Sequence, residues 1–407
     1  MQSTSQSFRH YSYLPFIITA LISGSALAAN PAQENNLQDI VKEEALIIPV
    51  QANVSARRPR IQLAILLDTS NSMDGLIDQT RNQLWQIVNE FAAARKGGVT
   101  PILEIALFEY GNDALSIDSG YIRKLTGFTR ELDAVSEGLF SLTTNGGSEY
   151  CGYAIRTAIK DLQWSQSNAD VKSIFIAGNE SFAQGPVDYR KVIKLAVKQG
   201  IEISTIHAGR DQEGINGGWE TGALLAGGAY MNIDADQKIV HIEAPQDKRL
   251  DELNAKLNST YIPYGTKGAE KVQRQQEQDA MSSRISAGLL AKRAKSKASS
   301  FYRNTEWDLV DALEEGEIDE KDLIKIEEND LPKSMKGMSD KAKVDYVREK
   351  TDERNRIKAE IAELSQSRNE YVSKLKREQA AVDPSLGDAL TEAVKQQAEE
   401  KDFVFEK

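Results

Sequence analysis

Cysteine is nearly absent from the sequence, which has one, Cys151, in 407 residues. A single cysteine excludes an internal disulfide even in an oxidising compartment, so stability must come from packing. The sequence also lacks the Cys and His spacings of zinc sites, and its stretch "TGALLAGGAY" lacks the lysine of a nucleotide-binding loop. These absences leave an enzyme with little support, and we expect a protein that is not an enzyme.

Positive charge is also in deficit, with 50 Lys and Arg against 61 Asp and Glu and a formal net charge of −11. The first 28 residues hold one charged residue, Arg9, so their removal would take one more positive charge and leave −12. An acidic chain repels the phosphate backbone, so the charge balance argues against a nucleic-acid partner.

Long apolar runs are missing after the first, "YLPFIITALISG", which follows Arg9 and His10 and precedes the small residues "SALAAN". This order is typical of a secretory signal peptide, here residues 1–28, cleaved after Ala28. We expect a mature chain without a transmembrane segment, located in the periplasm or secreted. A retained membrane anchor is the alternative, but the apolar core is shorter than the roughly 20 residues that span a bilayer.

A polar linker, residues 29–60, precedes a region from 61 to 245 in which aliphatic runs alternate with helical patterns. The runs "IQLAILL", "ILEIALFEY", "KSIFIAG" and "IEISTIH" resemble strands buried on both faces. Alternating strands and helices predict an α/β domain with a doubly wound, mostly parallel, Rossmann-like sheet.

Beyond Pro245 glycine becomes sparse and charge dense, which predicts an elongated, coiled-coil-like helical region over residues 246–407. A later seven-residue repeat holds Arg368 where an apolar residue is expected, and Trp307 needs a partner to pack against. Because the composition shifts at Pro245, we expect a chain ending there still to melt cooperatively.

Hydroxyl and acidic side chains follow the predicted strands at the points where they end. In a parallel sheet these carboxyl ends share one edge, where ligands bind. The candidate metal ligands at this edge are Asp68, Ser70, Ser72, Ser148 and Glu180. Glu149 and Cys151 reach the same edge in "TTNGGSEYCGYAI". Hard oxygen ligands suit Mg²⁺, with Mn²⁺ or Ca²⁺ as alternatives, although Asp and Ser also commonly cap helices and fill turns.

The stretch "DTSNS", placed after an aliphatic strand and before an amphipathic helix, resembles the Asp-x-Ser-x-Ser signature of von Willebrand factor type A (VWA) domains. The resemblance covers roughly residues 61–245 and implies a metal-ion-dependent adhesion site. It implies that Ser70 and Ser72 bind the metal, that Asp68 supports the site, and that Ser148 joins by its position. A carboxylate of the ligand commonly completes the coordination in that family.

The sequence departs from the family at Gly178, where an Asp leaving the fourth strand is usual. One fewer carboxylate weakens a divalent-cation site, and Glu180 is near enough in sequence to substitute. On this basis alone we expect Gly178→Asp to tighten cation binding, provided that the backbone there does not need a positive φ.

We therefore expect an exported binding module that engages a protein or cell-envelope partner through the carboxyl-end edge of its VWA sheet, with a divalent cation as the candidate bridge. One alternative is a metal-independent scaffold that acts through its C-terminal helices. Another is a hydrolase with Cys151 as nucleophile and His207 as base, although a packed role is the usual one for both residues. The sequence leaves the partner and the oligomeric state open.

Overall fold

A computed structural model describes residues 57–71, 73–233, 241–378 and 386–405. The expected signal peptide, most of the expected linker and the candidate ligand Ser72 lie outside the described residues. No helix within these ranges combines the length and apolarity needed to cross a membrane.

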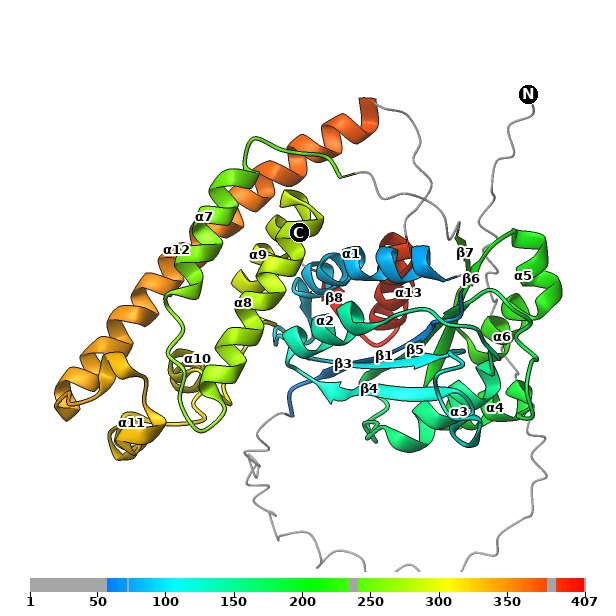
Figure 1. Ribbon diagram of the computed structural model, residues 1–407, viewed down its shortest axis with the longest axis horizontal. Coiled ribbons are helices and arrows are strands. Elements are labelled where there is room, and N and C mark those ends of the chain that lie inside the picture. Colours follow the sequence, from blue (N-terminus) through cyan, green and yellow to red (C-terminus); the bar gives the residue numbers. More distant parts are fainter. Residues whose placement is uncertain (1–56, 72, 234–240, 379–385, 406–407) are drawn as a thin grey trace, which may run out of the picture. The chain divides into compact units, whose positions relative to one another are not determined.

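The centre of the fold is a six-stranded sheet in the order β4-β3-β1-β5-β6-β7 (Figure 1). All neighbouring strands are parallel except β4, which is antiparallel to β3 at the edge. The strands are β1 (Arg60–Asp68), β3 (Ile102–Tyr110), β4 (Ile122–Thr129), β5 (Val171–Gly178), β6 (Glu202–Ala208) and β7 (Tyr230–Ile233). The predicted doubly wound, mostly parallel sheet is confirmed.

Helices cover both faces of this sheet, and β1 explains why, because its alternate side chains enter different cores. Leu63 and Ile65 pack with helices α1 (Asp74–Phe91) and α2 (Leu132–Ser141). Leu66 packs on the other face with the second group of helices. That group contains α3 (Cys151–Asp161), α4 (Tyr189–Lys198) and α6 (Trp219–Ala226), with α5 (Asp211–Gly217) beside α6.

The region after Pro245 is helical, as predicted. Its helices are α7 (Asp247–Asn258), α8 (Gly268–Ile285), α9 (Ala287–Ala298), α10 (Leu309–Glu314), α11 (Glu320–Lys325) and α12 (Asp340–Glu378). Two short 3₁₀ turns of this region are η2 (Glu328–Asp330) and η3 (Lys333–Met335), and a further one, η1 (Ile117–Ser119), lies between β3 and β4 of the α/β part. The long α12 runs beside α7 (Figure 1). Arg368 interrupts the apolar repeat of α12 because its guanidinium pairs with Asp247 of α7, both nearly buried.

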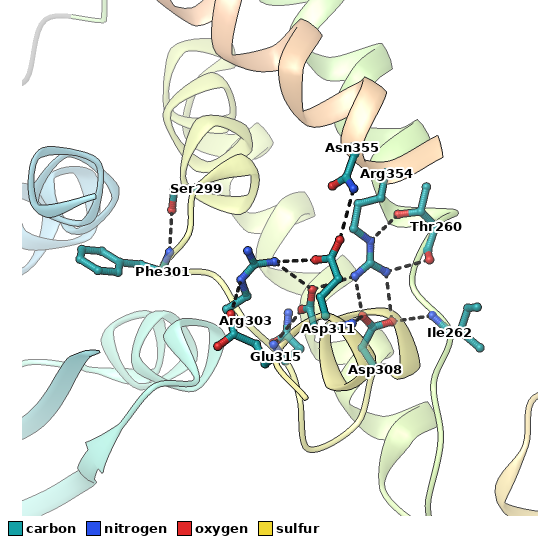
Figure 2. Close-up of polar contacts among 12 residues, drawn as sticks. Thr260, Ile262, Ser299, Phe301, Arg303, Asp308, Asp311, Glu315, Arg354 and Asn355 are labelled. Carbon is teal, nitrogen blue, oxygen red and sulfur yellow. Dashed lines mark hydrogen bonds and ion pairs between the residues drawn. The ribbon is translucent and has the colours of Figure 1, made fainter. Parts of the chain in front are cut away.

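A buried ionic network around Arg354 of α12 holds the outer helices together (Figure 2). Its guanidinium donates to Asp308 and Asp311 and to the carbonyl of Thr260, and it lies 4.1 Å from the ring centre of Tyr261. Arg354 and Asp308 have no exposed side-chain area. Trp307 stacks on Tyr261 at 5.7 Å between ring centres, which supplies the packing partner that its sequence position requires.

The helical region shares a hydrophobic core with α1 and α2. Arg293 of α9 is buried, pairs with Asp133 of α2 at 2.6 Å and lies 4.7 Å from the ring centre of Trp85 of α1. Leu253 and Ile361 of the helical region belong to the same apolar cluster as β1. All described residues accordingly fall in one compact unit.

The last described segment returns to the sheet. Helix α13 (Leu386–Glu399) packs against α1 and β5, and strand β8 (Val404–Phe405) pairs antiparallel with β2 (Ala94–Arg95). Residues 386–405 therefore pack with the α/β layer, although the sequence placed them in the helical region. The helices from α7 to α12 are thus an insertion between β7 and α13, joined to the α/β layer at both ends.

Candidate functional site

Strand β1 ends at Asp68, whose side chain has no exposed area. Its Oδ1 accepts a hydrogen bond of 2.8 Å from the backbone N–H of Ser70, which fixes the turn that leads into α1. Ser70 is also buried, at 4% exposure, and its hydroxyl contacts the carboxyl of Asp68. The sequence motif therefore folds inward, with its acid and its first serine side by side.

The Gly-Gly loop before α3 lies directly against this turn. The N–H of Asn145 donates to the carbonyl of Thr69 at 3.0 Å, and Gly147 adopts a φ of +143°. A Cβ at Gly147 would stand 1.7 Å from the carbonyl oxygen of Gly111 and 3.2 Å from Cβ of Ser70. Only glycine permits this close approach, which brings the following residues to the end of β1.

The acid that meets Asp68 is Glu149, which is 4% exposed. The two carboxyls contact each other and share the hydroxyl of Ser70. Gly111 confirms their proximity, since a Cβ there would stand 2.6 Å from Oδ1 of Asp68 and 2.9 Å from Cγ of Glu149. Oδ2 of Asp68 is buried and receives no hydrogen bond from the described residues. The structure thus places two acids in one buried pocket of the turn.

Burial raises the pKa of Asp68 well above its usual value, and the negative charge of Glu149 raises it further. Burial also raises the pKa of Glu149, to which the charge of Glu180 adds. Within the described ranges no Lys, Arg or His forms an ion pair with either acid. Two touching carboxyls in a buried site need a proton or a cation between them, because two negative charges there repel strongly.

Glu180 and Ser148 lie at the rim rather than in this buried centre. Glu180 is exposed, and its backbone takes part instead: its N–H donates to Oε2 of Glu149 at 3.3 Å and its carbonyl accepts from Nε1 of Trp219 at 2.7 Å. Ser148 is half-buried beside Glu149 in the chain. No group of three or more His, Cys, Asp or Glu among the described residues is arranged to hold a metal. Any cation site here must therefore combine the two acids with hydroxyl groups.

The topology now decides the fold family. The central strand carries the Asp-x-Ser-x-Ser turn at its carboxyl end, one edge strand is antiparallel, and a Gly-Gly loop opens a helix beside the turn. The α/β part has the von Willebrand factor type A fold. The VWA resemblance of the sequence is thereby confirmed for the sheet and its helices.

Solved structures, one of them described as a VWA domain, resemble this chain at low identity. Proximal thread matrix protein 1 from the mussel byssus is 16% identical over 44% of this chain and 43% of its own, with a TM-score of 0.33. BatB from Bacteroides thetaiotaomicron is 17% identical over 43% of this chain and 90% of its own, with a TM-score of 0.32. The SpRpn10 VWA domain is 14% identical, with coverages of 44% and 90% and a TM-score of 0.32.

The structure of the mussel protein has also been solved with zinc in its metal-ion-dependent adhesion site (MIDAS) motif. No known family model and no curated protein matches the sequence. At identities this low the resemblance concerns the fold alone.

The family usually has an Asp at the position of Gly178. Here the space that its side chain would enter is occupied by neighbouring side chains. A Cβ at Gly178 would stand 2.5 Å from the hydroxyl of Tyr110 and 3.1 Å from both Oδ2 of Asp68 and the ring of Trp219. The Tyr110 hydroxyl is fixed there because it donates to the carbonyl of Ala177 at 2.9 Å. A side chain at 178 would have to displace the Tyr110 hydroxyl, so the packing argues against the sequence-based expectation that Gly178→Asp restores the site.

We expect Gly178→Asp to destabilise the domain by about 1–3 kcal/mol, the usual cost of overpacking a core. Thermal unfolding with and without Mg²⁺ measures this. Gly178→Ala isolates the cost of the Cβ, and adding Tyr110→Phe to Gly178→Asp should recover part of the loss, because it removes the nearest atom. A Gly178→Asp protein of wild-type stability that binds Mg²⁺ more tightly would contradict the packing argument.

Cys151 and His207 do not form a catalytic pair within the described structure. Cys151 is 1% exposed, its Sγ lies 3.6 Å from the Tyr110 hydroxyl, and burial raises the pKa of its thiol. A nucleophilic cysteine needs the opposite shift. The ring of His207 is held by the carbonyl of Asn179 at 3.2 Å and by the amide of Asn232 at 3.1 Å. These contacts favour the packed interpretation of both residues.

Proposed function

We propose that this VWA domain is a binding module, not a catalyst, and that Asp68 and Glu149 hold a divalent cation at the carboxyl edge of its sheet. The observation that supports the proposal is the buried pair of touching carboxyls, which has no cationic partner among the described residues. Ser70 supplies a hydroxyl oxygen beside both acids, and Ser72 and Ser148 are the further candidate ligands. Two carboxylates with hydroxyl groups suit a hard cation such as Mg²⁺, Mn²⁺ or Ca²⁺.

Glu149 supplies a carboxylate in place of the Asp that the family usually has at the position of Gly178. It comes from the Gly-Gly loop instead of the fourth strand of the family pattern, and the backbone N–H of Glu180 orients its carboxylate. A bound cation would offer its remaining coordination positions to an oxygen of a partner. We therefore propose an exported protein that engages a protein or a cell-envelope component bearing a carboxylate, with no role for nucleic acid because the chain is acidic.

We expect Mg²⁺ or Mn²⁺ to raise the melting temperature of the full chain. A ligand that binds only the folded state stabilises it by about 2.7 kcal/mol at one hundred times its dissociation constant. Asp68→Asn and Glu149→Gln should each abolish this gain, because each removes one of the two charges. Glu363→Gln, which changes an exposed acid on α12, is the matched control and should keep the gain.

In EDTA, without a bound cation, the same variants should not lower the melting temperature. In the folded protein the pKa values of Asp68 and Glu149 are raised. The contribution of the protonated pair to folding stability is therefore fully present below the unfolded pKa values and is lost as the pH rises through the folded pKa values. At neutral pH without cation, Asp68→Asn should therefore melt no lower than the wild type. If no divalent cation stabilises the wild type even at tens of millimolar, the metal-independent scaffold acting through the helices replaces this proposal.

A further inference from the structure

Helices α1, α9 and α12 surround a second cavity of about 300 Å³, which lies apart from the cation site. Its α1 residues begin at Gln86, twelve residues after the start of that helix, or roughly 18 Å along its axis at about 1.5 Å per residue. Residues at helical spacing line it: Gly288, Lys292 and Lys295 on α9, and Ser365 and Arg368 on α12. Each helix thus turns one polar face toward the same space.

The lining has an excess of positive charge. Arg368 is already neutralised by Asp247, and Glu90, the one acid among the described lining residues, pairs with Lys395 of α13 at 2.8 Å. Lys292 donates to the neutral side-chain oxygen of Gln86 at 3.0 Å. Lys295 is half-buried and makes no hydrogen bond or ion pair within the part of the chain that the structure describes.

Lys292 and Lys295 stand three residues apart on one face of α9, where like charges repel. His241 also lines the cavity, and burial lowers its pKa. The positive charge of Lys292 lowers this pKa further, so the charge acts within the cavity. An anion between the two ammonium groups would remove this repulsion.

Ser365 gives a second, independent indication of a ligand. It is 2% exposed, it lines the cavity, and its hydroxyl has no hydrogen-bond partner among the described residues. Buried hydroxyls are normally satisfied, because leaving one unpaired costs free energy. The close packing of the cavity wall depends on a glycine. A Cβ at Gly288 would stand 2.6 Å from Nη2 of Arg368, so the glycine allows this guanidinium to pack against α9.

We propose that this cavity binds a phosphate monoester through Lys292, Lys295 and the hydroxyl of Ser365. Two ammonium groups and a hydroxyl match a dianion with three terminal oxygens better than a carboxylate, which has one charge and two oxygens. The cavity volume is at the lower end of the range for small-molecule sites, which limits the rest of the ligand to a small group. This inference is independent of the cation site.

The test uses the full chain in EDTA, with inorganic phosphate and glycerol 3-phosphate as probes and sodium chloride at equal ionic strength as reference. Both phosphates should raise the melting temperature and give a saturable signal by calorimetric titration. Lys295→Met should weaken binding by about tenfold or more, as expected for the loss of a charge-assisted hydrogen bond. Lys341→Met, at an exposed position on α12, should leave it unchanged.

Ser365→Ala separates a binding role from a structural one. It should leave the ligand-free melting temperature unchanged or higher, because it removes an unsatisfied hydroxyl, while it weakens phosphate binding. An equal gain from acetate overturns the phosphate assignment, and full phosphate binding by Lys295→Met or Ser365→Ala overturns the location. Vesicles with phosphatidic acid, compared with phosphatidylcholine alone, distinguish a lipid headgroup from a soluble ester, and either source supports the proposal.

Discussion

A chain ending at Pro245 is expected to unfold or aggregate rather than melt cooperatively, which reverses the expectation from composition. The helices beyond Pro245 cover α1, whose Trp85 and Phe91 have no exposed area. Arg293 lies over the ring of Trp85, and Phe405 lies 6.1 Å from Phe91 between ring centres. Each buried aromatic side chain contributes about 1.5–3 kcal/mol. Together these two contribute about 3–6 kcal/mol, which reaches the lower end of the roughly 5–15 kcal/mol that keeps a domain folded.

The matched control for this truncation is a chain from residue 57 to 407, which keeps every described residue. It should show one sharp thermal transition by circular dichroism, whereas residues 57–245 should show none or a much lower one. A fragment 57–245 that melts near the temperature of the control would mean that the α/β layer is stable without its helical cover.

Arg354→Met is the single substitution expected to destabilise the chain most. It leaves Asp308 buried without its cation and leaves Asp311 with Arg303 as its remaining ion-pair partner among the described residues. Removing one partner of a buried ion pair costs about 3–5 kcal/mol. Methionine has a similar length, so lost volume contributes little to the effect. Chemical denaturation with a linear extrapolation measures the loss.

Arg348→Met on the same helix is the control, since its pair with Glu320 is exposed on both sides and should matter little. Replacing Asp308 and Asp311 by Asn in the Arg354→Met background should restore part of the stability. Only part is expected, because the single amide oxygen of an Asn at 308 can accept one of the two backbone hydrogen bonds that Asp308 now receives from Ile262 and Asp311. A triple variant no more stable than Arg354→Met would show that charge burial is not the cause.

The parts of the fold that sequence predicts are those with a strong local pattern. The aliphatic runs became β1, β3, β5 and β6, since strands buried on both faces leave no polar alternation to confuse them. The edge strand β4 carries Arg123 and Lys124 exposed and contains Gly127, so its pattern does not mark a strand. Arg368 interrupts a helical repeat for a reason, its pair with Asp247, that lies 121 residues away in the chain.

The candidate site divides in the same way. Asp68 and Ser70 sit where the signature puts them, because the turn that joins them is local. The meeting of Glu149 with Asp68 depends on two close backbone approaches, at Gly111 and Gly147, that spacing along the chain does not reveal. The filling of the space at Gly178 by Tyr110 is equally nonlocal, since the two residues are on different strands. Nearness in sequence to Gly178, which favours Glu180, therefore does not predict which acid touches Asp68.

Strand β1 separates the start of the described chain from the candidate cation site. Residues 1–56 join the described chain at Arg57, which pairs with Asp170 at the end of the sheet where β1 begins. Asp68 lies at the other end of that strand, eight residue steps from Arg60, or roughly 26 Å at about 3.3 Å per step. The point where the described chain begins and the candidate cation site therefore lie at opposite ends of the central strand, so a change at one end need not disturb the other.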